Sequence, residues 1–190
     1  EYNNLTVTSG QHTARFAPSA RITGTLTVNG GNVLAEALAE IKALDVPVEN
    51  TTTSNVQLLG AVLNTFSTAT PINLTFQAPA TAQAQAPTFT NSAVGTVLEV
   101  VGSLKALAVT NASGSTLVVD ATQATQATAE DKLAVANSGT LQVVAGDKAV
   151  ADLINHGNTT APTPVVGIAG LAGEGENLGA APAETGSHYA

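Results

Sequence analysis

Residues that could perform acid–base or metal chemistry are few in this chain and lie far apart. The three histidines, His12, His156 and His188, lie far from one another, and none has a second histidine nearby at the spacing of a metal site. We interpret His156 as a favourable positive charge at the end of a short helix. The sequence therefore predicts no metal site and no cofactor.

Two groups of neighbouring carboxylates, Glu130–Asp131 and Glu174/Glu176, are candidates for a hydrolytic pair. A glycosidase holds two carboxyl groups at a set separation in a cleft, usually beside aromatic residues. This chain has four Phe, two Tyr and no Trp, so an aromatic sugar platform is hard to build. We interpret both groups as solvated surface charge.

The glycine-rich segment 170–179, GLAGEGENLG, could suggest a phosphate-binding loop. It has no Lys-Ser/Thr ending, and its two glutamates would repel a phosphate. The Gly-x-Ser-x-Gly motif of serine hydrolases and the Asp-x-Asp spacing of calcium loops are also missing. We therefore predict that the protein is not an enzyme.

The composition favours β structure and argues against two classes of partner. Hydrophobic residues make up 44% of the 190 residues, but they are mostly Ala, Val and Leu, mixed with much Thr and Gly. Such residues suit pleated sheets and tight turns. A net charge of −8 with only six Lys and Arg argues against nucleic-acid binding. No apolar run approaches the length of about 18 residues that a membrane-spanning helix needs.

Residues 21–44, RITGTLTVNGGNVLAEALAEIKAL, change their periodicity halfway. Residues 21–28 alternate as a strand, and Asn-Gly-Gly then forms a turn. The apolar residues that follow recur at helical spacing until Pro47 ends the pattern. So short a helix is marginal alone, and its apolar stripe predicts either a subunit contact or packing on the protein's own sheet. The stripe consists of Leu34, Leu38, Ile41 and Leu44.

Other segments have weaker patterns. Residues 4–8 and 72–76 alternate as strands, whereas 56–66 fit both types of structure and slightly favour a helix. The apolar spacing in residues 147–156 predicts another short helix. The composition of residues 77–87 is typical of an extended linker.

An internal repeat occupies the second half of the chain. The segments LAVTNASGSTLVV (107–119) and LAVANSGTLQVV (133–144) are two versions of one unit. We interpret each as a β-hairpin with an Asn/Ser/Gly turn, because two or three copies are too few for a solenoid. The expected fold is mainly β, a β-sandwich or jelly-roll-like hairpin domain with two or three short helices and extended terminal arms.

These patterns divide the chain into five segments. We expect an N-terminal arm (1–20), a strand–helix segment (21–76), a linker (77–90), a β-hairpin domain (91–156) and an extended C-terminal tail (157–190). A neighbouring subunit is the simplest support for such a tail. The chain also contains Asn-x-Ser/Thr sequences, which we interpret as unmodified turns unless the host glycosylates them. They begin at Asn4, Asn50, Asn73, Asn111 and Asn158.

The stretch GTLTVNGGNVL (24–34) resembles segments of bacteriophage fibre and head-decoration proteins. The resemblance implies a virion surface protein, commonly a trimer, that sits on the major capsid protein and stabilises the shell. We therefore expect a non-enzymatic structural subunit of a large assembly, a capsid decoration (cement) or head-fibre protein, which contacts copies of itself.

The alternative is a secreted pilus or filament subunit at the cell surface that assembles by strand exchange with neighbouring subunits. In that case Leu5 and Val7 would lie on the donated strand.

Overall fold

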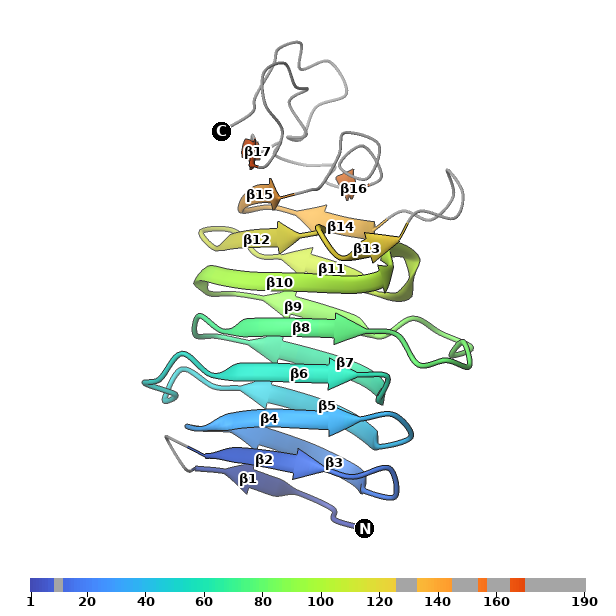
Figure 1. Cartoon of the computed structure of the whole chain (residues 1–190). Coiled ribbons are helices and arrows are strands. Elements are labelled where there is room, and N and C mark those ends of the chain that lie inside the picture. The colour runs from blue at the N-terminus through green and yellow to red at the C-terminus, as the bar shows by residue number, and fades with distance from the viewer. Residues whose placement is uncertain (9–11, 126–132, 145–153, 157–164, 170–190) are drawn as a thin grey trace.

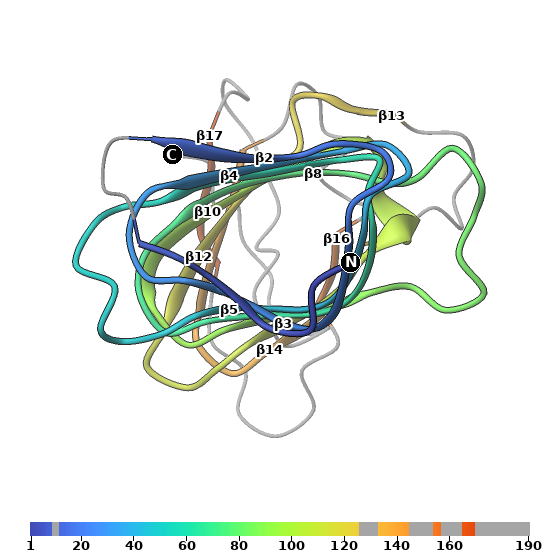
Figure 2. The same cartoon turned by 90° about the horizontal axis from the view of Figure 1, so that it is seen from below.

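The chain winds as a parallel β-solenoid (Figure 1). We analysed a computed structural model, which describes residues 1–8, 12–125, 133–144, 154–156 and 165–169. Each coil contributes one strand to each of two sheets, and the sheets face one another across the core (Figure 2). All strand pairings in the described part of the chain are parallel.

The strands alternate between the two sheets along the chain. The first sheet contains, in spatial order, β1 (Leu5–Val7), β3 (Arg21–Val28), β5 (Glu40–Val46), β7 (Val62–Thr68), β9 (Thr88–Asn91), β11 (Ala108–Asn111), β14 (Leu133–Asn137) and β16 (Ile154–His156). The second contains β2 (Thr13–Phe16), β4 (Asn32–Glu36), β6 (Asn55–Leu59), β8 (Asn73–Gln77), β10 (Val94–Ser103), β12 (Thr116–Asp120), β15 (Thr140–Val144) and β17 (Val165–Ala169). A short strand, β13 (Ala124–Thr125), pairs with β10, and a 3₁₀ turn, η1 (Leu104–Ala106), follows β10.

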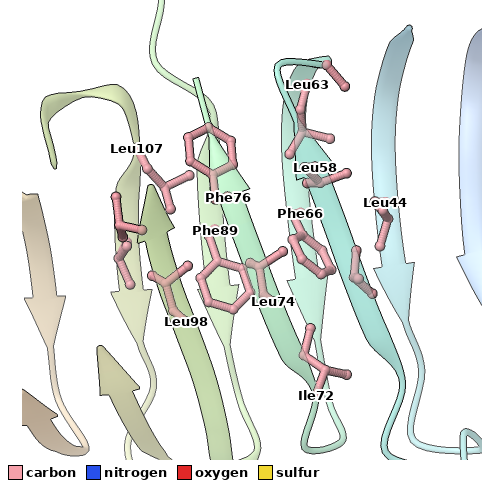
Figure 3. Packing of buried hydrophobic residues seen from close by; sticks show 14 of the residues in the cluster. Leu44, Leu58, Leu63, Phe66, Ile72, Leu74, Phe76, Phe89, Leu98 and Leu107 are labelled. Atoms are coloured by element: carbon pink, nitrogen blue, oxygen red, sulfur yellow. The ribbon is translucent and has the colours of Figure 1, made fainter. Parts of the chain in front are cut away.

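The core consists of columns in which similar side chains stack from coil to coil (Figure 3). Alternation along each strand turns every second residue inward. Phe66 lies in register with Phe89, and their ring centroids are 5.0 Å apart. In the second sheet the corresponding buried column is Val33, Val56, Leu74, Leu98, Val119 and Val143.

One inward position of the first sheet changes from apolar to polar along the solenoid. Val46 in β5 is followed in register by Thr68, and then by Asn91, Asn111 and Asn137. The asparagines are buried and form a ladder, in which Nδ2 of each donates to Oδ1 of the next over 2.9 Å. Asn111 Nδ2 also donates to the Thr140 carbonyl over 3.0 Å, so the buried amides are paired with one another and with the turns.

The expectation of a mainly β protein is confirmed, but the predicted helices are wrong, because the described residues form no α-helix. Residues 32–44 form β4, a turn and β5, while 56–66 belong to β6 and β7 with Gly60 at φ +84° between them. Of the predicted helix 147–156, residues 154–156 are strand β16 and the rest lies outside the described residues. Stacked coils satisfy each strand's backbone on both sides, whereas a short helix here would leave its neighbours unpaired.

The predicted β-hairpins, and with them the sandwich or jelly roll, are also wrong. The two halves of each repeated unit lie in different sheets, and the units pair with one another in parallel. Val109 faces Val135, and Leu117 faces Leu141. The repeat is therefore one coil of a solenoid, and the coils whose sequences diverge supply the further neighbours that a solenoid needs.

The strand ladder crosses the predicted segment boundaries. β1 and β2, from the predicted arm 1–20, pair with β3 and β4, and the predicted linker 77–90 leads into β9, which pairs with β7. In the predicted tail 157–190, β17 pairs with β15. The remainder of that tail lies outside the described residues.

We predict that Asn111→Ala lowers the free energy of unfolding by about 2–3 kcal/mol, because it leaves buried partners without a hydrogen bond. Thr110→Ala, at the exposed neighbouring position, should change it by about 0.5 kcal/mol or less. Guanidinium unfolding followed by circular dichroism measures both. Asn111→Val still fills space at this position but removes the hydrogen bonds. If this variant is as stable as the wild type, the ladder does not stabilise the fold.

Candidate functional site

The titratable residues singled out in the sequence are not brought together. His12 precedes β2 and His156 lies in β16, whereas His188 and the carboxylates Glu130, Asp131, Glu174 and Glu176 lie outside the described residues. Among the residues that the structure describes, no group of three or more His, Cys, Asp or Glu could hold a metal ion. The described part also contains no helix with the length and apolarity to cross a membrane.

The four residues of the predicted contact stripe are separated by the fold. Ile41 and Leu44 are buried in the core, with exposures of 2% and 1%, so neither is available to a partner. Leu34 is half-buried on the outer face of the second sheet. Leu38 is 73% exposed at the turn between β4 and β5, so only Leu34 and Leu38 remain candidates for a subunit contact.

Leu38 combines exposure with an unfavourable backbone conformation. Its φ is +70°, and it is the one residue other than glycine with positive φ in the described part of the chain. Such a conformation costs a non-glycine residue on the order of 1–3 kcal/mol. The turn is fixed on both sides, since Ala39 N donates to Glu36 O over 3.1 Å and Val62 N donates to Ala39 O over 2.8 Å. The fold therefore presents this side chain rigidly to solvent.

Two ion pairs flank the Leu38 turn. Arg15 meets Glu36 through two hydrogen bonds, Nε to Oε2 over 3.0 Å and Nη2 to Oε1 over 2.7 Å. Arg21 Nη2 donates to Glu40 Oε2 over 2.7 Å. The hydrogen bonds from Arg15 hold the pKa of Glu36 below its ordinary value. Leu38 thus stands between charged groups that are already paired within the chain.

A pocket lies on the same edge of the solenoid, where the loop 78–87 and η1 project from the coils (Figure 1). Its volume is about 410 Å³, and its walls are mostly alanine and proline. Lys105 and Gln83 are also among the lining residues. Gln83 Nε2 donates to the Leu63 carbonyl over 3.0 Å, which ties the loop to the neighbouring coil. The predicted linker is therefore the wall of a pocket.

The outer face of the first sheet is a regular array of small side chains, which we call the hydroxyl face. Two outward columns run across the coils. The inward column that contains Phe66 and Phe89 lies between them. From β1 to β14 their members are Thr, Ser or Ala, apart from Asp45, which accepts a 2.7 Å hydrogen bond from Ser67 Oγ. In β16, Asn155 follows Ala134 in register. The columns are Thr6, Thr27, Asp45, Ser67, Thr90, Thr110, Ala136 and Thr25, Ala43, Thr65, Thr88, Ala108, Ala134.

The residues predicted for a donated strand lie in the chain's own sheet. Leu5 and Val7 belong to β1, which pairs in parallel with β3, and Val7 is buried. The Asn-x-Ser/Thr sequences also differ in access. Asn50 and Asn111 are buried, Asn4 and Asn73 are exposed, and Asn158 lies outside the described residues. Sequence reasoning missed the hydroxyl face, although segments such as Thr-Leu-Thr-Val at 25–28 and Thr-Phe-Thr-Asn at 88–91 contain its signal.

Comparison of the chain with protein-family models, with curated proteins and with solved structures found no match.

We predict that Glu36→Gln lowers stability at neutral pH and that the difference from wild type disappears in strong acid. The pKa of Glu36 is lowered in the fold, so its contribution is present above the ordinary carboxyl pKa and is lost as the pH falls through the folded value. Denaturant midpoints at neutral and acidic pH measure this. Glu49→Gln, which removes the same charge from an exposed loop position without an ion pair to Arg15, is the matched control for the change in net charge.

Proposed function

We propose that the protein is a non-enzymatic structural subunit of a large assembly, a rigid solenoid that contributes its edges and faces to contacts with other subunits. The observation that carries the proposal is the parallel strand ladder, which runs through every coil in the described residues around one stacked core. In a solenoid each coil contacts mainly its neighbours, so the chain forms a stiff column with extended outer surfaces. Such a column suits a spacer or a brace.

The resemblance at residues 24–34 points to a virion surface as the place of this assembly, in the manner of a capsid decoration or head-fibre protein. In the structure this stretch forms the second part of β3, the Asn29–Gly31 turn and the start of β4. The partners would then be copies of this chain, in a trimer or another homo-oligomer, and the major capsid protein. A net charge of −8 supports solubility of such a surface protein.

The alternative, a pilus subunit that donates its first strand, has less support. A donated strand must leave its own subunit, but β1 pairs with β3 at Leu5–Leu26, Thr6–Thr27 and Val7–Val28. Removal of β1 would break this pairing and expose the next coil. Secretion to a cell surface with assembly through other contacts stays compatible with the solenoid.

We predict that antibodies raised against the chain label the surface of virus particles from the source at regular positions in immunogold electron microscopy. Pre-immune serum is the control. Label on filaments instead of particles would favour the alternative. Purified particles and filaments that both lack the protein would contradict the assembly proposal.

A second candidate function is suggested by the hydroxyl face. Adjacent strands of a sheet lie about 4.7–4.9 Å apart and alternate residues about 6.4–6.8 Å apart, so its methyl and hydroxyl groups form a rigid, nearly rectangular lattice. Oxygen atoms on the surfaces of ice repeat at comparable distances. Partner-binding surfaces instead concentrate aromatic residues and Arg and contain little Ser and Ala. The array therefore favours binding to a periodic, hydrogen-bonding surface such as ice.

We predict that the wild-type chain is incorporated into slowly growing ice and that Thr90→Lys removes most of this incorporation, because a long, hydrated side chain interrupts the lattice. The protein concentration in the ice fraction and thermal hysteresis measure the effect. Gln57→Lys adds the same charge to the outer face of the second sheet and should have no effect. Exclusion of the wild-type chain from ice would rule out this second function.

A further inference from the structure

Two complementary features lie on one edge of the solenoid. The turn that presents Leu38 joins β4 to β5, and the loop 78–87 joins β8 to β9. Both connections pass from the second sheet to the first, so they project from the same edge at different heights (Figures 1 and 2). One feature is a protruding apolar side chain and the other is an apolar pocket.

The Leu38 side chain is held in place without being buried by its own chain. It is 73% exposed and sits at φ +70° in a turn whose backbone is hydrogen-bonded on both sides. Backbone strain that persists at an exposed apolar residue points to a role outside the monomer fold. A fixed side chain also loses little conformational entropy when it inserts into a partner.

The pocket has the size and the walls to receive such a side chain. Its volume of about 410 Å³ exceeds that of a leucine side chain, so part of the surrounding turn could enter with it. Lys105 adds a positive charge to a lining that otherwise consists mainly of short apolar side chains. These are Ala78, Pro79, Ala80, Ala82, Ala86, Pro87 and Ala106.

We propose that two copies of the chain pair edge to edge in antiparallel orientation, with Leu38 of each copy inserted into the pocket of the other. A two-fold axis places the Leu38 turn of each copy at the height of the other copy's pocket. Both contacts therefore form at once, and the dimer is closed. Lys105 of one copy would lie near the ion pairs Arg15–Glu36 and Arg21–Glu40 that flank Leu38 of the other, which gives the contact a charged rim around an apolar centre. The inference deepens the proposed function, on which it rests, by naming the surface through which copies associate.

A second copy fits this pocket better than a small polar ligand does. Small-molecule sites combine an apolar lining with several convergent polar groups that fix the ligand's orientation. Here the lining offers chiefly alanine and proline, with Lys105, Ser103 and Gln83 as its polar members. The Gln83 amide nitrogen already donates to Leu63 O, and its Oε1 atom is buried without a hydrogen-bond partner. The apolar side chain of Leu38 matches the alanine and proline walls.

The first test is sedimentation velocity of the full chain over a range of concentrations. We expect a monomer–dimer equilibrium, and we expect Leu38→Asp to weaken dimerisation by about tenfold or more. Val48→Asp is the matched control, because Val48 is 70% exposed on the opposite edge, and it should leave the equilibrium unchanged. Circular dichroism checks that both variants are folded. A dimer that Leu38→Asp does not weaken overturns the inference.

The second test identifies the paired residues by cross-linking, which is clean because the chain contains no cysteine. Leu38→Cys and Ala82→Cys chains, carrying different tags, are mixed and oxidised. We expect a disulfide-linked heterodimer that contains both tags, and no cross-linked product from Leu38→Cys alone. Cross-links only between two Leu38→Cys chains, or a wild-type chain that stays monomeric at all concentrations, would overturn the inference. Labelling on particles would leave the assembly proposal standing in either case.

Discussion

The fold depends on one arrangement, the in-register stacking of coils through parallel backbone hydrogen bonds. No coil can bury its inward residues alone, because each is a thin layer with two open faces. The ladder also continues through the turns: Asn29 N donates to Val7 O over 2.8 Å, and Thr140 N donates to Ser115 O over 2.9 Å. This continuity lets a chain with few aromatic residues build a core, since each small or medium side chain packs against its counterparts above and below.

Stacking also determines what the surface can be. Once the inward columns are fixed, the outward residues of successive coils must form columns as well, and any bias in their composition becomes a patterned face. The small side chains at Thr65, Thr88 and Ala108 lie in one column for this reason. Insertions are tolerated only between strands, so the loop 78–87 projects from an edge and leaves both sheets unbroken. Rigid faces and variable edges are thus two results of one constraint.

Individual strands were predictable from the sequence, but their arrangement was not. Alternation correctly indicated strands at 21–28 and 72–76. It failed at 32–44, because the turn at Leu38 interrupts the alternation and leaves an apolar spacing that imitates a helix. The solenoid period was hidden because the turns differ in length. Asn91 and Asn111 stack at a separation of 20 residues, but Asn111 and Asn137 at 26.

The candidate surfaces were harder to predict than the strands. The contact stripe mixed Ile41 and Leu44, which face the core, with Leu38, which faces solvent, because a helical interpretation assigns all of them to one side. The pocket wall was predicted to be a linker, because alanine and proline carry no periodic signal that would place them against η1. Both surfaces arise from contacts between neighbouring coils whose residues are far apart in the sequence, and the local sequence pattern does not contain such contacts.

The buried asparagine ladder also restricts which coils can stack on one another. Val28 and Val46 are buried and pack through shape alone, so many apolar side chains would fit against them equally well. The amides of Asn91, Asn111 and Asn137 bond to one another from coil to coil and also to the turns beside them. Gly139 has no space for a Cβ, because the carbonyls of Ala112 and Ser115 lie next to it. A misaligned coil that placed a valine against Asn111 would leave this buried amide without a ladder partner. The polar half of the column therefore disfavours stacking of its coils against a coil that contributes valine.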